Sequence, residues 1–108
     1  MNETITPTEL QAQLNQKTAL QLLDVRRQQD FAAEPTLIPG AVWHDPAEVN
    51  SWAAQLHPEQ PVVIYCARGG SVSKSTQETL RAKGLSVQYI EGGLVGWQEN
   101  CGAGITPK

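Results

Sequence analysis

Short runs of apolar residues alternate along the chain with segments whose apolar residues recur at helical spacing. An apolar run of four to six residues predicts a buried strand, and three such runs occur: Leu20 to Val25, Val62 to Tyr65 and Val87 to Ile90. The β-branched run Val62 to Tyr65 is typical of a central parallel strand that is buried on both faces. A Pro39-Gly40 turn leads into a further short strand near Val42.

Two of the predicted helices begin with a capping signal. Thr6-Pro7-Thr8-Glu9 combines an N-cap hydroxyl, a proline at the first helical position and a glutamate three residues after the cap, so a helix should run from here to near Lys17. Asp45-Pro46-Ala47-Glu48 repeats this signal, and one apolar face continues the second helix to Leu56. The other predicted helices are a brief one over Gln28 to Glu34, one over Ser71 to Lys83 with Val72 and Leu80 facing inward, and a short last one that contains Leu94, Val95 and Trp97.

This alternation of strands and helices predicts an α/β fold. We expect a mostly parallel central sheet of about five strands, right-handed crossovers and helices on both faces. A length of 108 residues suits one hydrophobic core, so residues 1–108 should form a single domain. Parallel sheets bind ligands beyond the carboxyl ends of their strands, and Asp24 and Cys66 both fall at such an end.

Charge and cysteine content narrow the function classes. Eleven acidic and eight basic residues are interspersed and give a net charge of -3, which argues against nucleic acid or an anionic membrane as the partner. No segment approaches the roughly 20 apolar residues of a membrane span, and no secretion signal opens the chain. Two cysteines are too few for a disulfide scaffold, so we expect a reducing, cytoplasmic setting.

The segment from Cys66 to Ser71 joins a strand to a helix through a glycine-bearing loop. Such a loop directs several backbone N–H groups toward its centre, where they stabilise an anion, and Gly69 and Gly70 permit the necessary backbone conformations. The sulfur of Cys66 would lie among these donors, so its pKa should fall below the free value of ~8.5 and leave a nucleophilic thiolate. Alternatively, Cys66 is a buried apolar residue at a strand end. Arg68 either binds the anionic part of a substrate or is a solvated loop charge.

Four short motifs occur in a specific order along almost the whole chain: Leu23-Asp24-Val25-Arg26, Ile38-Pro39-Gly40-Ala41, Val63-Ile64-Tyr65-Cys66, and Gly92-Gly93 followed by Gly96-Trp97. With these motifs the sequence resembles a single-domain rhodanese of the thiosulfate sulfurtransferase family. The resemblance implies a rhodanese-like domain in which Cys66 is the catalytic residue. Cys66 would take a sulfane sulfur from thiosulfate or a similar donor, become a persulfide, and pass the sulfur to a thiophilic acceptor such as cyanide, a thiol or a protein. No metal or organic cofactor is implied.

The resemblance also implies a substrate-binding loop that acts mainly through its backbone. Its residues would be Ala67, Arg68, Gly69, Gly70, Ser71 and Val72. Many family members carry arginine at the position of Ser71 and histidine at the position of Leu37, and Arg68 would substitute for the missing charge. We expect these departures to affect substrate preference more than the transfer itself.

Five further side chains either have two interpretations or are given no chemical role. Asp24 either accepts hydrogen bonds from loop N–H groups or tunes the field at the site, and Arg26 should form an ion pair or hydrogen bond near the same edge. Cys101 is either incidental or a resolving thiol that needs proximity to Cys66. His44 and His57 match no metal-ligand spacing with the cysteines, so no metal site is expected.

Two other functions compete with sulfur transfer to small molecules. A rhodanese-like module could bind a partner protein or carry persulfide to it. A cysteine phosphatase or arsenate reductase uses a similar anion-binding loop, but a phosphatase of the Cys-x5-Arg type needs arginine where this chain has Val72.

Overall fold

Five parallel strands form the central sheet of the computed structural model, which describes residues 4–16, 20–33, 36–38, 40–57, 59–67, 71–101 and 106–107. Their order across the sheet is β1-β6-β5-β2-β4. The bounds are β1 Thr4–Ile5, β2 Gln21–Asp24, β4 Val42–Trp43, β5 Val62–Tyr65 and β6 Val87–Ile90. The predicted α/β fold with a parallel sheet of about five strands is therefore confirmed.

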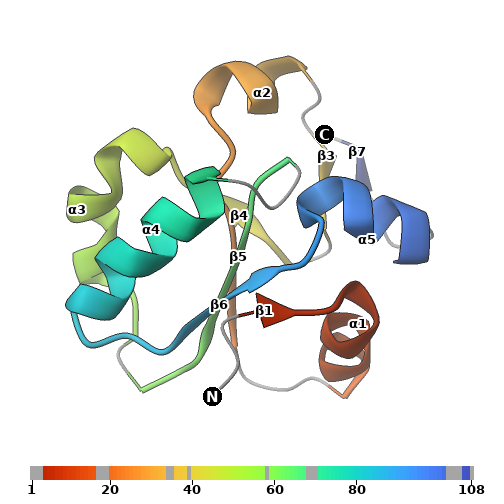
Figure 1. Ribbon diagram of the computed structural model, residues 1–108, viewed down its shortest axis with the longest axis horizontal. Helices are drawn as coiled ribbons and strands as arrows, with labels where there is room; N and C mark the ends of the chain where they lie inside the picture. Colours follow the sequence, from red (N-terminus) through yellow and green to blue (C-terminus); the bar gives the residue numbers. More distant parts are fainter. Residues whose placement is uncertain are drawn as a thin grey trace.

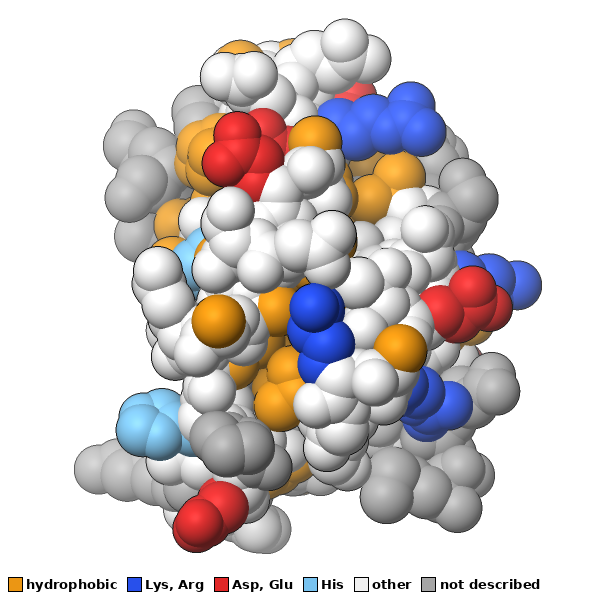
Figure 2. All heavy atoms as spheres, turned by 90° about the vertical axis from the view of Figure 1, so that its left-hand side faces the viewer, with side chains coloured by type: hydrophobic (Ala, Val, Ile, Leu, Met, Phe, Trp, Pro, Cys, Tyr) orange, Lys and Arg blue, Asp and Glu red, His pale blue; other side chains and the backbone are white. Residues whose placement is uncertain are grey.

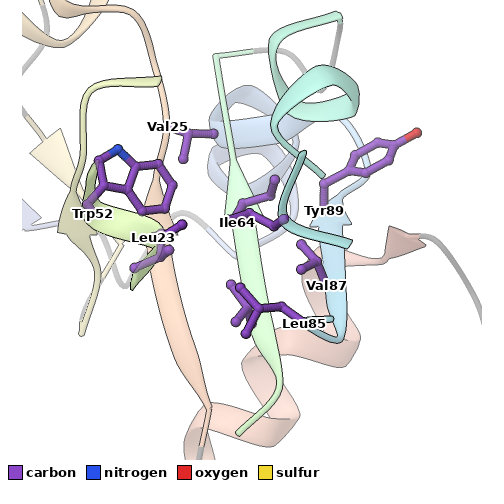
Figure 3. Close-up of a cluster of buried hydrophobic side chains, with 10 residues drawn as sticks. Leu23, Val25, Trp52, Ile64, Leu85, Val87 and Tyr89 are labelled. Atoms are coloured by element: carbon purple, nitrogen blue, oxygen red, sulfur yellow. The ribbon is translucent and has the colours of Figure 1, made fainter. Parts of the chain in front are cut away.

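Helices cover both faces of this sheet (Figure 1). On one face lie α1 (Pro7–Asn15) and α5 (Gly93–Cys101), and on the other lie α3 (Val49–Trp52) and α4 (Ser71–Ala82). Because successive strand residues point to opposite faces, Leu22 and Val63 pack under α1 and α5, whereas Leu23 and Ile64 pack under α3 and α4. Figure 3 shows the second cluster, in which Trp52 lies beside Leu23 and Val25. Side chains of β5 and β6, among them Ile64, Val87 and Tyr89, continue the cluster across the sheet. The central strand β5 is buried along its whole length, as its β-branched sequence predicts.

The predicted capping box opens α1. The Glu9 N–H donates to Thr6 Oγ1 at 3.1 Å, and the Thr6 N–H donates to Glu9 Oε1 at 3.0 Å. The helix ends at Asn15, and the predicted end near Lys17 lies outside the described residues. Preceding it, the two-residue strand β1 pairs with β6, which no pattern in the sequence predicted.

The helix predicted from Asp45 to Leu56 is wrong as a continuous α-helix. The segment consists of a 3-10 turn η1 (Pro46–Glu48), the single α-turn α3, and a second 3-10 turn η2 (Ala53–Gln55). Its first and last turns are closed by hydrogen bonds between residues three apart, as in a 3-10 helix. The Glu48 N–H donates to Asp45 O at 3.0 Å, and the Leu56 N–H donates to Ala53 O at 3.2 Å. The Trp52 indole also donates to Asp45 O at 2.8 Å, so a side-chain bond across the segment helps to hold this shape.

A short helix, α2 (Gln28–Ala33), lies beyond the carboxyl edge of the sheet and at the top of Figure 1. None of its residues is buried. It is held by Phe31, whose ring stacks on Trp43 at a centroid distance of 4.9 Å while the Arg26 guanidinium lies 5.2 Å from the Phe31 centroid. A two-stranded antiparallel sheet of β3 (Thr36–Leu37) and β7 (Thr106–Pro107) was also not predicted.

Candidate active site

Cys66 follows β5 directly at the carboxyl edge of the sheet, and its side chain is 6% exposed. Asp24 is the last residue of β2 and lies in register with Tyr65, the residue before the cysteine. The Val25 N–H extends this pairing by donating to Tyr65 O at 2.8 Å. The edge predicted from the sequence therefore brings Asp24 and Cys66 onto neighbouring strand ends.

The start of α5 holds the chain as it leaves Cys66. The Leu94 N–H donates to Cys66 O at 2.8 Å, and the Val95 N–H donates to Ala67 O at 3.0 Å. The first N–H groups of a helix have no partner within the helix, so here they serve to fix the cysteine segment. This role of Leu94 and Val95 was not predicted from the sequence.

Gly92 and Gly96 explain why this contact needs glycine. Gly92 has φ +77°, in the left-handed region that favours glycine. A Cβ atom on Gly96 would lie 2.6 Å from Glu91 O, closer than real Cβ atoms come to a backbone oxygen. The close approach of α5 to the end of β6 is thus possible only without a side chain at position 96.

Asp24 and Arg26 form a buried ion pair beside the site. The Arg26 Nη2 atom lies 2.6 Å from Asp24 Oδ2, and Nε donates to both carboxylate oxygens at 3.0 and 2.9 Å. The Arg26 backbone N–H donates to Asp24 Oδ1 at 2.9 Å. The Arg26 and Asp24 side chains are 2% and 0% exposed, respectively. Arg26 therefore forms the expected ion pair, and its partner is Asp24 itself.

Tyr65 connects this pair to the segment before Gly40. Its hydroxyl accepts from the Ile38 N–H at 3.3 Å and is hydrogen-bonded to Asp24. Burial, followed by the negative charge of Asp24, raises the pKa of Tyr65 well above its ordinary value. The phenol stays protonated and can donate to the Asp24 carboxylate. Asp24 and Tyr65 thus link the end of β2, the end of β5 and the segment at Ile38.

The structure describes both ends of the predicted substrate-binding loop. Ala67 is half-buried after Cys66, and Ser71 begins α4. Arg68, Gly69 and Gly70 lie outside the described residues, as does the side chain of Cys101. Val72 was predicted to face inward, but it is half-buried, whereas Leu80 is fully buried as expected. The reason is that the first turn of α4 borders an open cleft.

This cleft, of about 960 Å³, lies between α2, η1 and α4. Figure 2 shows the side of the molecule that carries α3 and α4, on which basic and acidic side chains are interspersed. The cleft is lined by residues from all three elements: Arg27, Gln28, Gln29, Ala32, Asp45, Pro46, Ala47, Val72, Ser75 and Thr76. Of the predicted site residues, Val72 lines it. The other lining residues were not identified from the sequence, because no motif includes them.

Within the described part of the chain, no three His, Cys, Asp or Glu side chains are grouped so that they could hold a metal ion. No helix in that part is long and apolar enough to cross a membrane.

Comparison with known proteins gives partial matches in sequence and full-length matches in structure. The tRNA 2-selenouridine synthase of Shewanella oneidensis is 32% identical over 73 residues, which are 68% of this chain and 19% of that protein. The enzyme of the same name from Shewanella frigidimarina is 40% identical over 45 residues, 42% of this chain and 12% of that protein. The chain thus spans less than a fifth of the length of these relatives.

Solved structures match nearly the whole chain. A rhodanese-like domain protein from Staphylococcus aureus has a TM-score of 0.82 at 26% identity, covering 99% of both chains. A full-length protein from Lactobacillus plantarum has a TM-score of 0.87 at 21% identity, covering 98% of this chain and 88% of that one. The sequence model of the rhodanese-like domain matches residues 6–100. With nearly the whole chain matched in sequence and in fold, the chain belongs to the family of rhodanese-like domains.

Proposed function

We propose that this chain is a sulfurtransferase that carries a sulfane sulfur on Cys66. The observation that carries this proposal is the position of the cysteine. Cys66 follows the central strand, its carbonyl is held by the N–H of Leu94, and the segment after it leads into the first turn of α4. Membership of the rhodanese-like family supports a sulfurtransferase type of activity.

The transfer proceeds in two displacement steps. In the first, the Cys66 thiolate attacks the outer sulfur of thiosulfate, a sulfur–sulfur bond forms to Cys66, and the original sulfur–sulfur bond breaks with its electron pair leaving on sulfite. In the second, the thiolate of an acceptor attacks the outer sulfur of the Cys66 persulfide and releases the Cys66 thiolate. Cyanide reacts in the same way and leaves as thiocyanate. Each step exchanges one nucleophile for another, so neither needs an oxidant or a reductant.

The backbone of the loop stabilises the anionic persulfide in this mechanism. The N–H groups from Ala67 to Val72 would surround the outer sulfur, and Arg68 would assist in binding an anionic donor. Asp24 and Arg26 are paired with each other, so in this mechanism they position the edge of the sheet and do not take part in the transfer. A reducing, cytoplasmic setting keeps the Cys66 thiol available for the reaction.

Intact mass measurement tests the proposal directly. The reduced protein is incubated with thiosulfate, desalted and weighed, and then treated with cyanide. We expect the gain of one sulfur atom and its loss on cyanide addition. Cys66→Ala should abolish the gain, whereas Cys101→Ala, which leaves the proposed nucleophile in place, should retain it. A folded wild-type protein that gains no sulfur from thiosulfate would rule out this donor.

A second candidate is a persulfide carrier that serves a partner protein. It is favoured by the relatives named tRNA 2-selenouridine synthase, in which the matching segment is part of a much longer chain. Turnover with small thiols separates the two candidates. A carrier forms the Cys66 persulfide but transfers it to small thiols no faster than a solvent-exposed persulfide does.

A cysteine phosphatase is not favoured, because the position six residues after Cys66 is Val72, which offers no fork of N–H donors for phosphate.

A further inference from the structure

The cleft between α2, η1 and α4 is larger than the proposed sulfur donor requires. Its volume of about 960 Å³ falls near the upper end of the range in which drug-sized ligands bind. Thiosulfate is a small dianion and needs only the loop around the cysteine. The cleft therefore has room for a second and larger reactant.

The position of the cleft connects it to the reaction. Val72, in the first turn of α4, lines the cleft and is also the last residue of the predicted substrate-binding segment that follows Cys66. Arg27 lines the cleft from the segment before α2, three residues beyond Asp24, which is in register with Tyr65. A ligand in the cleft therefore lies against the carboxyl-terminal end of the segment that follows Cys66.

Arg27 is the one cation among the residues that line the cleft in the described part of the chain. Its backbone is fixed, because its carbonyl accepts from the N–H groups of Asp30 and Phe31, both at 3.0 Å. Its side chain is exposed, and among the described residues nothing forms an ion pair or hydrogen bond with the guanidinium. A guanidinium that is unpaired and carried on a fixed backbone is well suited to bind a carboxylate.

The carboxylate of Asp45 argues against a multiply charged anion as the ligand of the cleft. The Asp45 carboxylate lines the same cleft, where Oδ1 accepts from the Ala47 N–H at 2.9 Å. Its charge would repel a dianion such as thiosulfate. A molecule with one carboxylate can pair with Arg27 while the rest of it contacts Ser75, Thr76 and the glutamine side chains of α2.

We infer that the cleft binds the sulfur acceptor, and that this acceptor is a low-molecular-weight thiol whose carboxylate pairs with Arg27. The inference rests on the proposed function, since it names the acceptor of that reaction. The thiolate of the bound acceptor attacks the outer sulfur of the Cys66 persulfide, the new persulfide forms on the acceptor, and Cys66 leaves as a thiolate. Charge and atoms balance without a further reactant.

The test compares two acceptors of similar size, 3-mercaptopropionate and the neutral 2-mercaptoethanol. The persulfide is formed with thiosulfate, desalted and mixed with either thiol, and the loss of sulfur is followed by intact mass. In Arg27→Gln the second-order rate constant with 3-mercaptopropionate should fall about fivefold relative to that with 2-mercaptoethanol, as expected for loss of one partly exposed ion pair. Arg27→Lys should restore most of the difference.

Lys83→Gln is the matched control, because it removes the same charge from an exposed residue at the other end of α4. It should leave the ratio of the two rate constants at its wild-type value. A ratio that is unchanged in Arg27→Gln, or that falls equally in Lys83→Gln, would overturn the inference. So would a wild-type persulfide that reacts with neither small thiol but does react with a protein thiol.

A binding measurement separates failure of the inference from failure of the proposed function. The S-methyl derivative of 3-mercaptopropionate cannot accept sulfur, so its binding to the resting protein does not depend on persulfide formation. We expect it to shift the backbone amide signals of Arg27 and Val72 in NMR spectra, and its dissociation constant should rise about fivefold in Arg27→Gln. If no persulfide forms, the proposed transfer from thiosulfate fails while this titration still decides the ligand of the cleft; shifts confined to other residues would refute the assignment.

Discussion

Replacing Gly96 by alanine should destabilise the fold and displace the segment that carries Cys66. The added Cβ atom would lie 2.6 Å from Glu91 O and 3.7 Å from Pro7 Cγ. The first neighbour is a backbone atom at the end of β6, so it cannot rotate away as a side chain would. Relief requires α5 to move as a unit away from the sheet.

The size of the effect follows from the contacts of α5. Ordinary contact at a Cβ begins near 3.4 Å, so the helix and the carbonyl must separate by a further 0.8 Å, the difference from 2.6 Å. A movement of this size would break the bonds from Leu94 N–H to Cys66 O and from Val95 N–H to Ala67 O, now 2.8 and 3.0 Å long. Overpacking costs ~1–3 kcal/mol and each lost bond ~1 kcal/mol, while alanine regains ~1 kcal/mol of helix propensity. We expect a net loss of about 2–4 kcal/mol.

Urea unfolding followed by tryptophan fluorescence measures this loss, and the rate of Cys66 alkylation by iodoacetamide in the native protein reports the site. Gly84→Ala is the control: Gly84 has φ +89°, but no atom lies within 4 Å of the position that its Cβ would take, so only backbone strain of ~1–2 kcal/mol is expected. The alkylation rate should change in Gly96→Ala and not in Gly84→Ala. Unfolding of Gly96→Ala within ~0.5 kcal/mol of wild type would refute the crowding argument. A destabilised variant with an unaltered alkylation rate would show that α5 does not position Cys66.

Three further predictions concern the surroundings of the site. Asp24→Asn leaves Arg26 buried beside a neutral group and should lower the free energy of unfolding in urea by ~3–5 kcal/mol. The double variant Asp24→Asn/Arg26→Met should lose ~1–3 kcal/mol less than the sum of the two single variants, and strict additivity would contradict the coupling. Because the pKa of Tyr65 is raised in the folded state, the unfolded phenol releases its proton first as the pH rises above ~10, so stability should fall there, and the fall should be shallower in Tyr65→Phe; equal slopes would exclude this linkage. Thr6→Ala removes one half of the capping box and should lower stability by ~1 kcal/mol in the same urea assay without changing Cys66 alkylation, whereas an unchanged midpoint would show that the cap contributes nothing.

The parallel sheet could be predicted because its three central strands are apolar in sequence. The runs that contain β2, β5 and β6 are buried on both faces, so their composition alone distinguishes them from the helices. Once the strands are known to be parallel, their carboxyl ends must share one edge. The common location of Asp24 and Cys66 follows from that rule rather than from any contact between the two residues.

Strands β1 and β3 and the segment after Asp45 could not be predicted in the same way. β1 and β3 have two residues each, too few for a periodic pattern, and they are strands only because β6 and β7 lie beside them. In the segment after Asp45, the capping signal was present, but the bond from the Trp52 indole to Asp45 O depends on the folded arrangement. Likewise, the donors Leu94 and Val95 act through backbone N–H groups, which leave no mark on residue type.

The motifs that identify the family and the residues that would select a substrate are largely different sets. Asp24 and Arg26 pair with each other, and Gly96 permits a close backbone contact, so these motif residues position the edge that carries Cys66. Arg27 and Asp45 line the cleft but belong to none of the motifs. Because the backbone interactions at Cys66 do not depend on loop side chains, we expect Ser71, where many family members carry arginine, to affect the choice of reactant in the proposed transfer without abolishing it. Family membership therefore supports the type of chemistry, and the acceptor has to be sought in the residues that line the cleft.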